Sequence, residues 1–391
     1  MHRRPNTSRA LPAAAILFLF PPLPLALALA ATPSSADPAP TAAPAAAPSA
    51  HHAADAPHTR PIVVEGVVEL HESPLAPTRV RPEHNAALRW WRAWADHDHQ
   101  QARRIANALD NPDLPTDSLR SLLKHHVHAL HLARRAADLP DCDFGVDYSL
   151  GIHADLPHLA PLRTSAQLLI LSARYHAELG HHELAARDLA RALNAAAHAR
   201  TDRLLVSSLV ATALAAAAAQ EALRLHQQDL LTPAHRDHLA DALRRFPRRD
   251  PFGVHAAIET EGLLHARWAE LLLTADPDEP DHADRLRLRV AELGDPGLPT
   301  IDADRYLGPD GRDRLDRDLD AFRAYSRLAA DAWAAAATDG DRAPLDRLES
   351  ALSTNEFGPI TELLAPGLAI VHKNHTRAVQ KLDRLRDALR P

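Results

Sequence analysis

The sequence predicts an all-α protein, built as an irregular array of antiparallel helical hairpins. Aromatic residues make up only 4% of the 391-residue chain, and alanine and leucine, both strong helix formers, dominate its apolar residues. Apolar positions recur at spacings of three and four between glycine and proline breaks, as expected of amphipathic helices. Residues 61–70, PIVVEGVVEL, are the one segment that favours a short strand.

The clearest pair of helices lies on either side of Gly180. Apolar residues spaced by three and four run from Leu159 to Ala173, and a matching face runs from Ala185 to Ala196. Glycine ends a helix readily because it adopts the left-handed conformation without strain. The hairpin ARYHAELGHHELAARDLARAL is similar to one tetratricopeptide-repeat unit, which implies an arrangement like that of repeat or α-solenoid proteins. No 34-residue period extends it on either side.

Residues 204–219, LLVSSLVATALAAAAA, predict a helix buried at the centre of the protein. The segment is apolar nearly all round, and sixteen residues are short for a membrane span. In the segment 85–109 we expect a break near Asp96–Asp98, because Asp98 with Gln101 is typical of a helix cap. The remaining predicted helices cover 233–246, 251–274, 281–293, 312–338, 341–352 and 367–389.

The N-terminal region is typical of an exported protein. Residues 1–36 combine arginines with a long apolar run and predict a signal peptide, cleaved after Ala30 or Ala36. Residues 37–61 are rich in Ala and Pro and predict an extended linker. A single helical domain is expected over 62–390. We therefore expect a periplasmic, envelope or secreted protein with no membrane span in its mature form.

Charge and cysteine content narrow the function classes. Residues 1–36 contain three arginines and no acidic residue, so the remaining chain has 41 basic and 51 acidic side chains, a net charge of −10. Such a chain repels phosphate backbones, which argues against a nucleic-acid partner. One cysteine excludes an internal disulfide framework. Stability must then come from packing between helices.

The segment PDCDFGVDYSLGIHADLPHL, residues 140–159, contains the only cysteine of the chain. Asp141 and Asp143 flank its sulfur, and negative neighbours disfavour the reactive thiolate. The aspartates also suggest a calcium loop, but Gly145 occupies the fifth position and Val146 the sixth, where an EF-hand needs an acidic group and a glycine. We therefore predict an ordered corner between helices, formed by Cys142, Asp143, Phe144, Asp147 and Tyr148.

Several histidine clusters suggest metal binding. His125, His128 and His131 are three apart in KHHVHALHLARR, which predicts three imidazoles spread over one side of a helix. Neighbouring arginines would repel a cation, and no thiolate or acidic partner lies nearby. A solvated helix face accounts for these histidines, and for the clusters at 96–99 and 181–183. No metal or other cofactor is expected.

The segment VHAAIETEGLLHARWAELL, residues 254–272, places two polar side chains in an apolar stripe. Val254 and Trp268 define this stripe, and Glu261 and His265 fall within 20° of its centre, one helical turn apart. Such groups are costly to bury without partners. They predict a structural network between helices, a pocket lining or a pair of acid–base groups.

Taken together, several segments resemble a family of exported, helix-rich bacterial proteins without an assigned activity. The segments are HNAALRWWRAW, LPDCDFGVDYSLGIHADLPHLAPLR, SARYHAELGHHELAARDLARAL and the helix containing Glu261, in this order. The resemblance extends from about residue 84 to the C-terminus and implies an all-helical fold and an exported location. It implies no catalytic residues.

Three function classes follow from these patterns. The first is a scaffold or binding module that holds a protein or envelope component in a groove between helices. The second is an enzyme that uses Glu261 and His265. The third and weakest is metal binding by surface histidines. Motifs of nucleotide binding, serine hydrolysis and zinc proteolysis do not occur in the sequence, which favours the first class.

Overall fold

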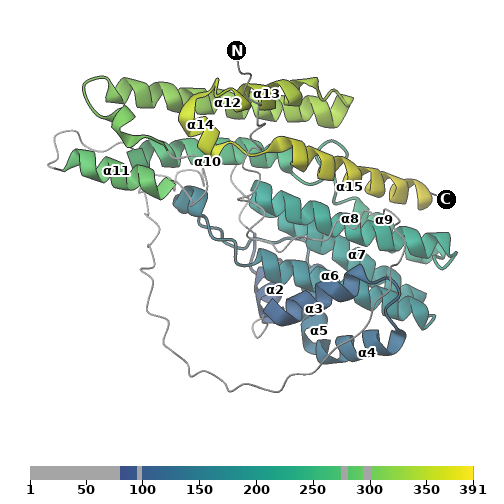
Figure 1. Cartoon of the computed structure of the whole chain (residues 1–391). Helices are drawn as coiled ribbons and strands as arrows, with labels where there is room; N and C mark the ends of the chain where they lie inside the picture. Colours follow the sequence, from purple (N-terminus) through teal and green to yellow (C-terminus); the bar gives the residue numbers. More distant parts are fainter. Residues whose placement is uncertain (1–79, 95–98, 274–280, 294–300, 391) are drawn as a thin grey trace, which may run out of the picture.

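The computed structural model describes residues 80–94, 99–273, 281–293 and 301–390 (Figure 1). The described residues form α-helices and short 3₁₀ helices with no strand, so the all-α prediction is confirmed. The predicted signal peptide, the linker and the strand at 61–70 lie outside the described residues.

The helices follow one another with short connections. They are α2 (Ala87–Ala93), α3 (His99–Asp110), α4 (Thr116–His125), α5 (Val127–Ala137), η2 (Tyr148–His153), α6 (Leu159–Glu178), α7 (His182–Ala199), η3 (Arg200–Asp202), α8 (Leu205–Gln227), α9 (Pro233–Leu243), α10 (Val254–Leu273), α11 (His282–Leu293), η4 (Ala303–Tyr306), α12 (Gly311–Asp339), α13 (Ala343–Ser353), α14 (Gly358–Leu364) and α15 (Leu368–Ala388).

The helices pack as a bundle of two unequal groups. Helices α2 to α9 form one group, and α10 to α14 form a second layer above it in Figure 1. The last helix, α15, returns to the first group and lies alongside α8, while α10 packs on both α12 and α8. One large apolar core fills the first group and extends to α12, α13 and α15, and a smaller core surrounds Trp268 and Phe322.

Helix α8 is the centre of the bundle. It packs against α6, α7, α10 and α15, and its buried residues cover most of its circumference, as predicted for a central helix. A stripe that includes Ala213 and Gln220 is exposed. By length and composition α8 qualifies as a membrane span, but 67% of its most apolar window is buried inside the protein. Its many alanines allow four neighbouring helices to approach closely. Burial of this kind is typical of a core helix.

The hairpin of α6 and α7 confirms the predicted pair. Gly180 between them has a φ of 78°, in the left-handed region that glycine adopts without strain. The apolar faces of both helices are buried against each other and against α8.

The prediction that His125, His128 and His131 share one helix is wrong. Helix α4 ends at His125 and α5 begins at Val127, with a break at His126. The break turns the His126 side chain inward, to 4% exposure, where its ring lies 6.2 Å from that of Trp94. Burial of this one imidazole therefore interrupts the expected helix. Helix α14 was not expected, and the predicted break at Asp96–Asp98 falls in residues 95–98, outside the described part.

The corner at residues 140–158 is fastened at both ends. At its start, the Asn85 side chain accepts from the Asp143 N–H at 3.0 Å and donates to the Asp143 carbonyl at 2.9 Å. The Asn85 amide thus makes the two hydrogen bonds to Asp143 that a residue of a neighbouring strand would make. At its end, Gly151 has a φ of 56° and its backbone packs directly on the indole of Trp268 in α10. The corner therefore ties α2 to α10.

Replacement of Gly151 by alanine tests this close packing. A Cβ at this position would overlap the Trp268 ring in a left-handed conformation, so we expect the free energy of unfolding to fall by at least about 2 kcal/mol. Gly145→Ala is the matched control: its φ is 68°, but a Cβ there meets no atom within 4 Å, so about 1 kcal/mol is expected. Urea unfolding measures both. Equal losses in the two variants would contradict the packing of Gly151 on Trp268.

Candidate functional site

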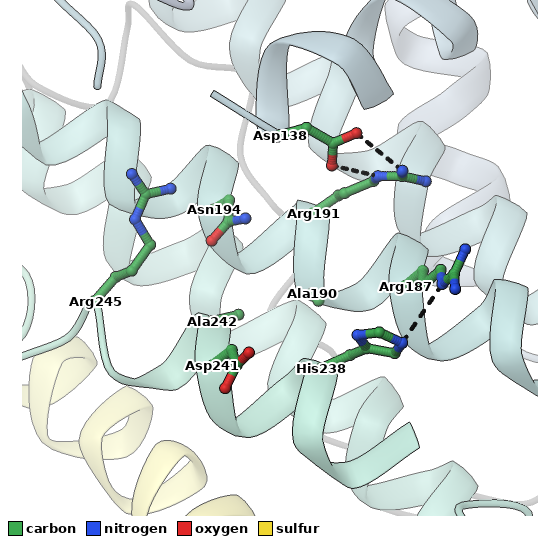
Figure 2. Close-up of a pocket in the computed structure, with 9 residues that line it drawn as sticks. All are labelled: Asp138, Arg187, Ala190, Arg191, Asn194, His238, Asp241, Ala242 and Arg245. Atoms are coloured by element: carbon green, nitrogen blue, oxygen red, sulfur yellow. Dashed lines mark hydrogen bonds and ion pairs between the residues drawn. The ribbon is translucent and has the colours of Figure 1, made fainter. Parts of the chain in front are cut away.

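An open groove of about 390 Å³ lies between α7 and α9, next to the C-terminal end of α5 (Figure 2). Polar residues of α7 line one side at spacings of four and three, which places them on the face opposite its buried apolar stripe. Residues of α9 and the turn after it line the other side. The lining residues are Asp138, Arg187, Ala190, Arg191, Asn194, His238, Asp241, Ala242 and Arg245.

Most charges in this groove are neutralised by neighbours. Arg191 binds both oxygens of Asp138, at 2.8 and 2.9 Å, and also contacts the buried Asp188. Burial lowers the pKa of Arg191, but these bonds outweigh it and raise the pKa above its ordinary value. Arg187 pairs with Glu183 at 2.5 Å. The paired arginines are therefore held in place as rigid donors.

Arg245 is different from the other arginines of the groove. Among the described residues it has no carboxylate within ion-pair distance, and it donates instead to the carbonyl of Pro140. Burial lowers the pKa of Arg245, and the charge of Asp141 offsets part of this shift. A guanidinium nevertheless remains protonated at neutral pH. Within the described part of the chain, Arg245 is therefore a positive charge of the groove that no carboxylate pairs with directly.

Asn194 offers an acceptor beside this charge. Its Nδ2 donates to the carbonyl of Ala137 at 3.1 Å, which fixes the orientation of the amide. Its Oδ1 is buried and has no hydrogen-bond partner among the described residues. An unpaired buried acceptor costs free energy, which a ligand with an N–H donor would recover.

The arrangement favours binding of an anionic group rather than chemistry on it. Arg245 can donate to a carboxylate, and Asn194 can accept from an N–H group of the same ligand. Among the described lining residues there is no serine, cysteine or lysine that could act as a nucleophile.

Glu261 and His265, the pair singled out in the sequence, lie on α10 but do not bind each other in the described structure. Glu261 Oε1 accepts from the backbone N–H of Leu205 at 2.6 Å. Leu205 is the first residue of α8, and the residue before it supplies no side-chain cap. Glu261 therefore caps the central helix from a neighbouring one, where the helix dipole favours negative charge.

Burial shifts the pKa of both side chains in opposite directions. It raises the pKa of Glu261 to about 7, and the hydrogen bond from Leu205 opposes this shift. It lowers the pKa of His265 to about 4. Both groups therefore favour their neutral forms in the folded protein. The contact of Glu261 with a backbone group favours the structural interpretation of this pair.

Cys142 lies in the corner with 3% exposure. Burial raises the pKa of its thiol well above the ordinary range, and the charges of Asp202 and Asp143 raise it further. The Asp143 carboxylate accepts from the Gly145 N–H at 2.9 Å, as expected for an aspartate that stabilises a turn. Tyr148 is buried, while Phe144 and Asp147 line a small cavity of the corner.

The predicted surface histidines are not assembled into a metal site in the described part of the chain. His125, His128 and His131 are exposed. Within the described ranges, no three side chains of metal-ligand type lie close enough together to hold an ion.

The groove was not predicted from the sequence. Its signal is present as polar residues at 187, 191 and 194 on one face of α7, and again at 238 and 241 on α9 and at 245 in the turn after it. Neither set indicates that the two faces meet. Only the packing of α9 on α7 brings them together.

Comparisons with known protein families, curated proteins and solved structures find no match to this chain. The resemblance to exported, helix-rich bacterial proteins therefore stays a prediction.

Replacement of Glu261 by glutamine tests the helix cap and its ionisation. The pKa of Glu261 is higher in the folded protein than its ordinary value of 4.5, so its contribution to stability is present below pH 4.5 and is lost as the pH rises through 7. Glutamine keeps the acceptor oxygen and cannot ionise. We expect the change in unfolding free energy between pH 5 and pH 8 to differ from that of the wild type by on the order of 1–2 kcal/mol, with the variant favoured at pH 8.

Glu259→Gln on the exposed side of the same helix is the control, and urea unfolding at both pH values is the measurement. His265 contributes in the opposite sense, since stability from its lowered pKa is lost as the pH falls from 6.5 through 4, but this contribution is common to all three proteins. The same pH dependence in Glu261→Gln and wild type would show that the pKa of Glu261 is not raised in the folded protein.

Proposed function

We propose that this chain is an exported helical binding protein that holds an acidic segment of a partner protein in the groove between α7 and α9. The observation that carries this proposal is the pairing of Arg245, without a carboxylate partner among the described residues, with the unsatisfied Oδ1 of Asn194 in one groove. Together they present a positive donor and a neutral acceptor. A peptide with an acidic side chain supplies a carboxylate and backbone N–H groups that match both.

The size of the groove supports a short segment as its ligand. A volume of about 390 Å³ is within the range of ordinary ligand pockets, and the groove is open to solvent along one side. Ala190 and Ala242 keep the space between the helices free of larger side chains. The fixed pairs around Arg191 and Arg187 lower the entropy cost of binding, because these donors are already held in place.

The sequence supports the remaining parts of the proposal. The likeness of the α6–α7 hairpin to a tetratricopeptide-repeat unit supports a peptide-binding scaffold, since helical repeats use such surfaces for extended ligands. The N-terminal pattern supports export, which sequencing of the mature N-terminus would test. The engagement of Glu261 in a helix cap supports binding over acid–base catalysis.

Replacement of Arg245 by glutamine tests the charge of the groove. We expect fluorescence anisotropy to show binding of labelled decapeptides with a net charge of −4 and none of peptides of +4. Loss of a charged hydrogen bond should lower the affinity of Arg245→Gln for the acidic peptide about tenfold. Arg248→Gln is the matched control, because Arg248 is exposed and does not line the groove. Equal affinities in the two variants, or equal binding of basic peptides, would contradict the proposal.

Arg245 also donates to Pro140, so a second pair of variants separates binding from folding. Ala190 is partly exposed on the groove side of α7. Ala190→Glu adds a negative charge there and should lower the affinity for the acidic peptide. Ala190→Lys, of similar size, should raise this affinity. The opposite order would contradict an anion-binding groove.

A further inference from the structure

A second, smaller cavity of about 170 Å³ lies at the corner, beside α2. It shares no lining residue with the groove between α7 and α9. Aromatic side chains, two aspartates and one buried histidine line it. Those that bear on its chemistry are Trp91, Phe144, Asp147, Asp155 and His158.

His158 is held in one orientation. Its ring is stacked on Phe144 with centroids 4.0 Å apart and an interplanar angle of 14°, and Trp91 approaches it edge-on at 6.3 Å. Its Nε2 lies 2.8 Å from the Asp202 carboxylate, and both side chains are only 3% exposed. Since a carboxylate oxygen accepts, Nε2 is the nitrogen that bears the proton.

Asp202 is itself held in place by further hydrogen bonds. Ser207 of α8 donates to the same Asp202 oxygen at 2.8 Å, and Tyr148 donates to the Asp202 backbone carbonyl at 2.6 Å. These contacts leave the His158 ring no freedom to flip its nitrogens. Its other nitrogen, Nδ1, therefore presents a lone pair and has no hydrogen-bond partner in the described part of the chain.

The surroundings of this lone pair are negative and aromatic. Asp147 and Asp155 are exposed at the edge of the cavity, and Trp91 is 37% exposed and presents its indole there. An anion would be repelled by the Asp155 carboxylate, and an apolar ligand would leave Nδ1 unsatisfied. The group that satisfies all three features is a cation that donates an N–H bond.

We propose that the corner cavity binds a small primary ammonium group, which donates to His158 Nδ1, lies against Trp91 and is neutralised by Asp155. This site is independent of the acidic-segment groove, because no residue lines both cavities. Its ligand class is a free amine or an amine-bearing side chain small enough for about 170 Å³. The dyad of His158 and Asp202 acts as an oriented acceptor.

Titration with n-butylammonium chloride at constant ionic strength tests the site. Binding is followed by NMR through the Trp91 indole and His158 imidazole resonances of the full-length protein. We expect saturable shifts of these resonances, with at least tenfold weaker binding of n-butanol, of butyrate and of tetramethylammonium, which has no N–H donor. Equal binding of any of the three, or shifts confined to residues away from the cavity, would overturn the proposal.

Two variants locate the binding. Asp155→Asn changes an exposed residue and should weaken n-butylammonium at least threefold, whereas Asp313→Asn, an exposed aspartate at the start of α12, should leave the affinity unchanged. Trp91→Leu should weaken binding by a similar factor through loss of the aromatic face. Unchanged affinity in Asp155→Asn and Trp91→Leu would overturn the assignment to this cavity.

Discussion

The buried carboxylate of Asp202 is the contact on which the arrangement of the first group of helices depends. It lies at the end of η3 and joins three separate parts of the chain: His158 at the start of α6, Ser207 in the first turn of α8 and, through its backbone carbonyl, Tyr148 of the corner. A buried charge is tolerated only when its oxygens are well bonded. The position of the corner, and hence the shape of the cavity beside it, follows from satisfying this one group.

The same principle recurs in the alanine-rich core. Alanine buries little apolar area, so each helix contact contributes less than leucine or phenylalanine would. In addition to apolar packing, buried carboxylates bonded to arginines hold neighbouring helices together. Asp188 of α7 binds Arg134 of α5 through two bonds of 2.9 and 2.6 Å, and Glu221 of α8 binds Arg174 of α6. The planar guanidinium suits such pairs, whereas lysine occurs at only three positions of the chain.

The groove and the corner are positioned by this framework. Arg245 lies between them: it donates to Pro140 at the start of the corner and lines the groove between α7 and α9. Nearby, His198 of α7 accepts from the Trp90 indole at 3.2 Å and bonds to the Leu139 carbonyl at 3.1 Å. Burial lowers the pKa of His198 to about 3, so it stays neutral and can accept from Trp90. The two candidate sites thus depend on some of the same supporting residues but have no lining residue in common.

Local patterns in the sequence predicted the helices, whereas the two candidate sites are formed by contacts between residues far apart in the sequence. The burial of α8 follows from its nearly uniform apolar composition, and the turn at Gly180 follows from the conformational freedom of glycine. The partner of Glu261 is a backbone N–H, which has no signature in a sequence. Asp202 and His158 are 44 residues apart, and nothing in either segment indicates the other. The groove was missed for the same reason, since its two faces come from different helices.

A double-mutant cycle between His158 and Asp202 tests the central claim most directly. His158→Phe keeps an aromatic ring against Phe144 and removes the bond, and Asp202→Asn keeps the shape and removes the charge. Urea unfolding of the wild type, both single variants and the double variant gives their coupling energy. The account predicts a favourable coupling of at least about 1 kcal/mol. Additive effects of the two substitutions would contradict it.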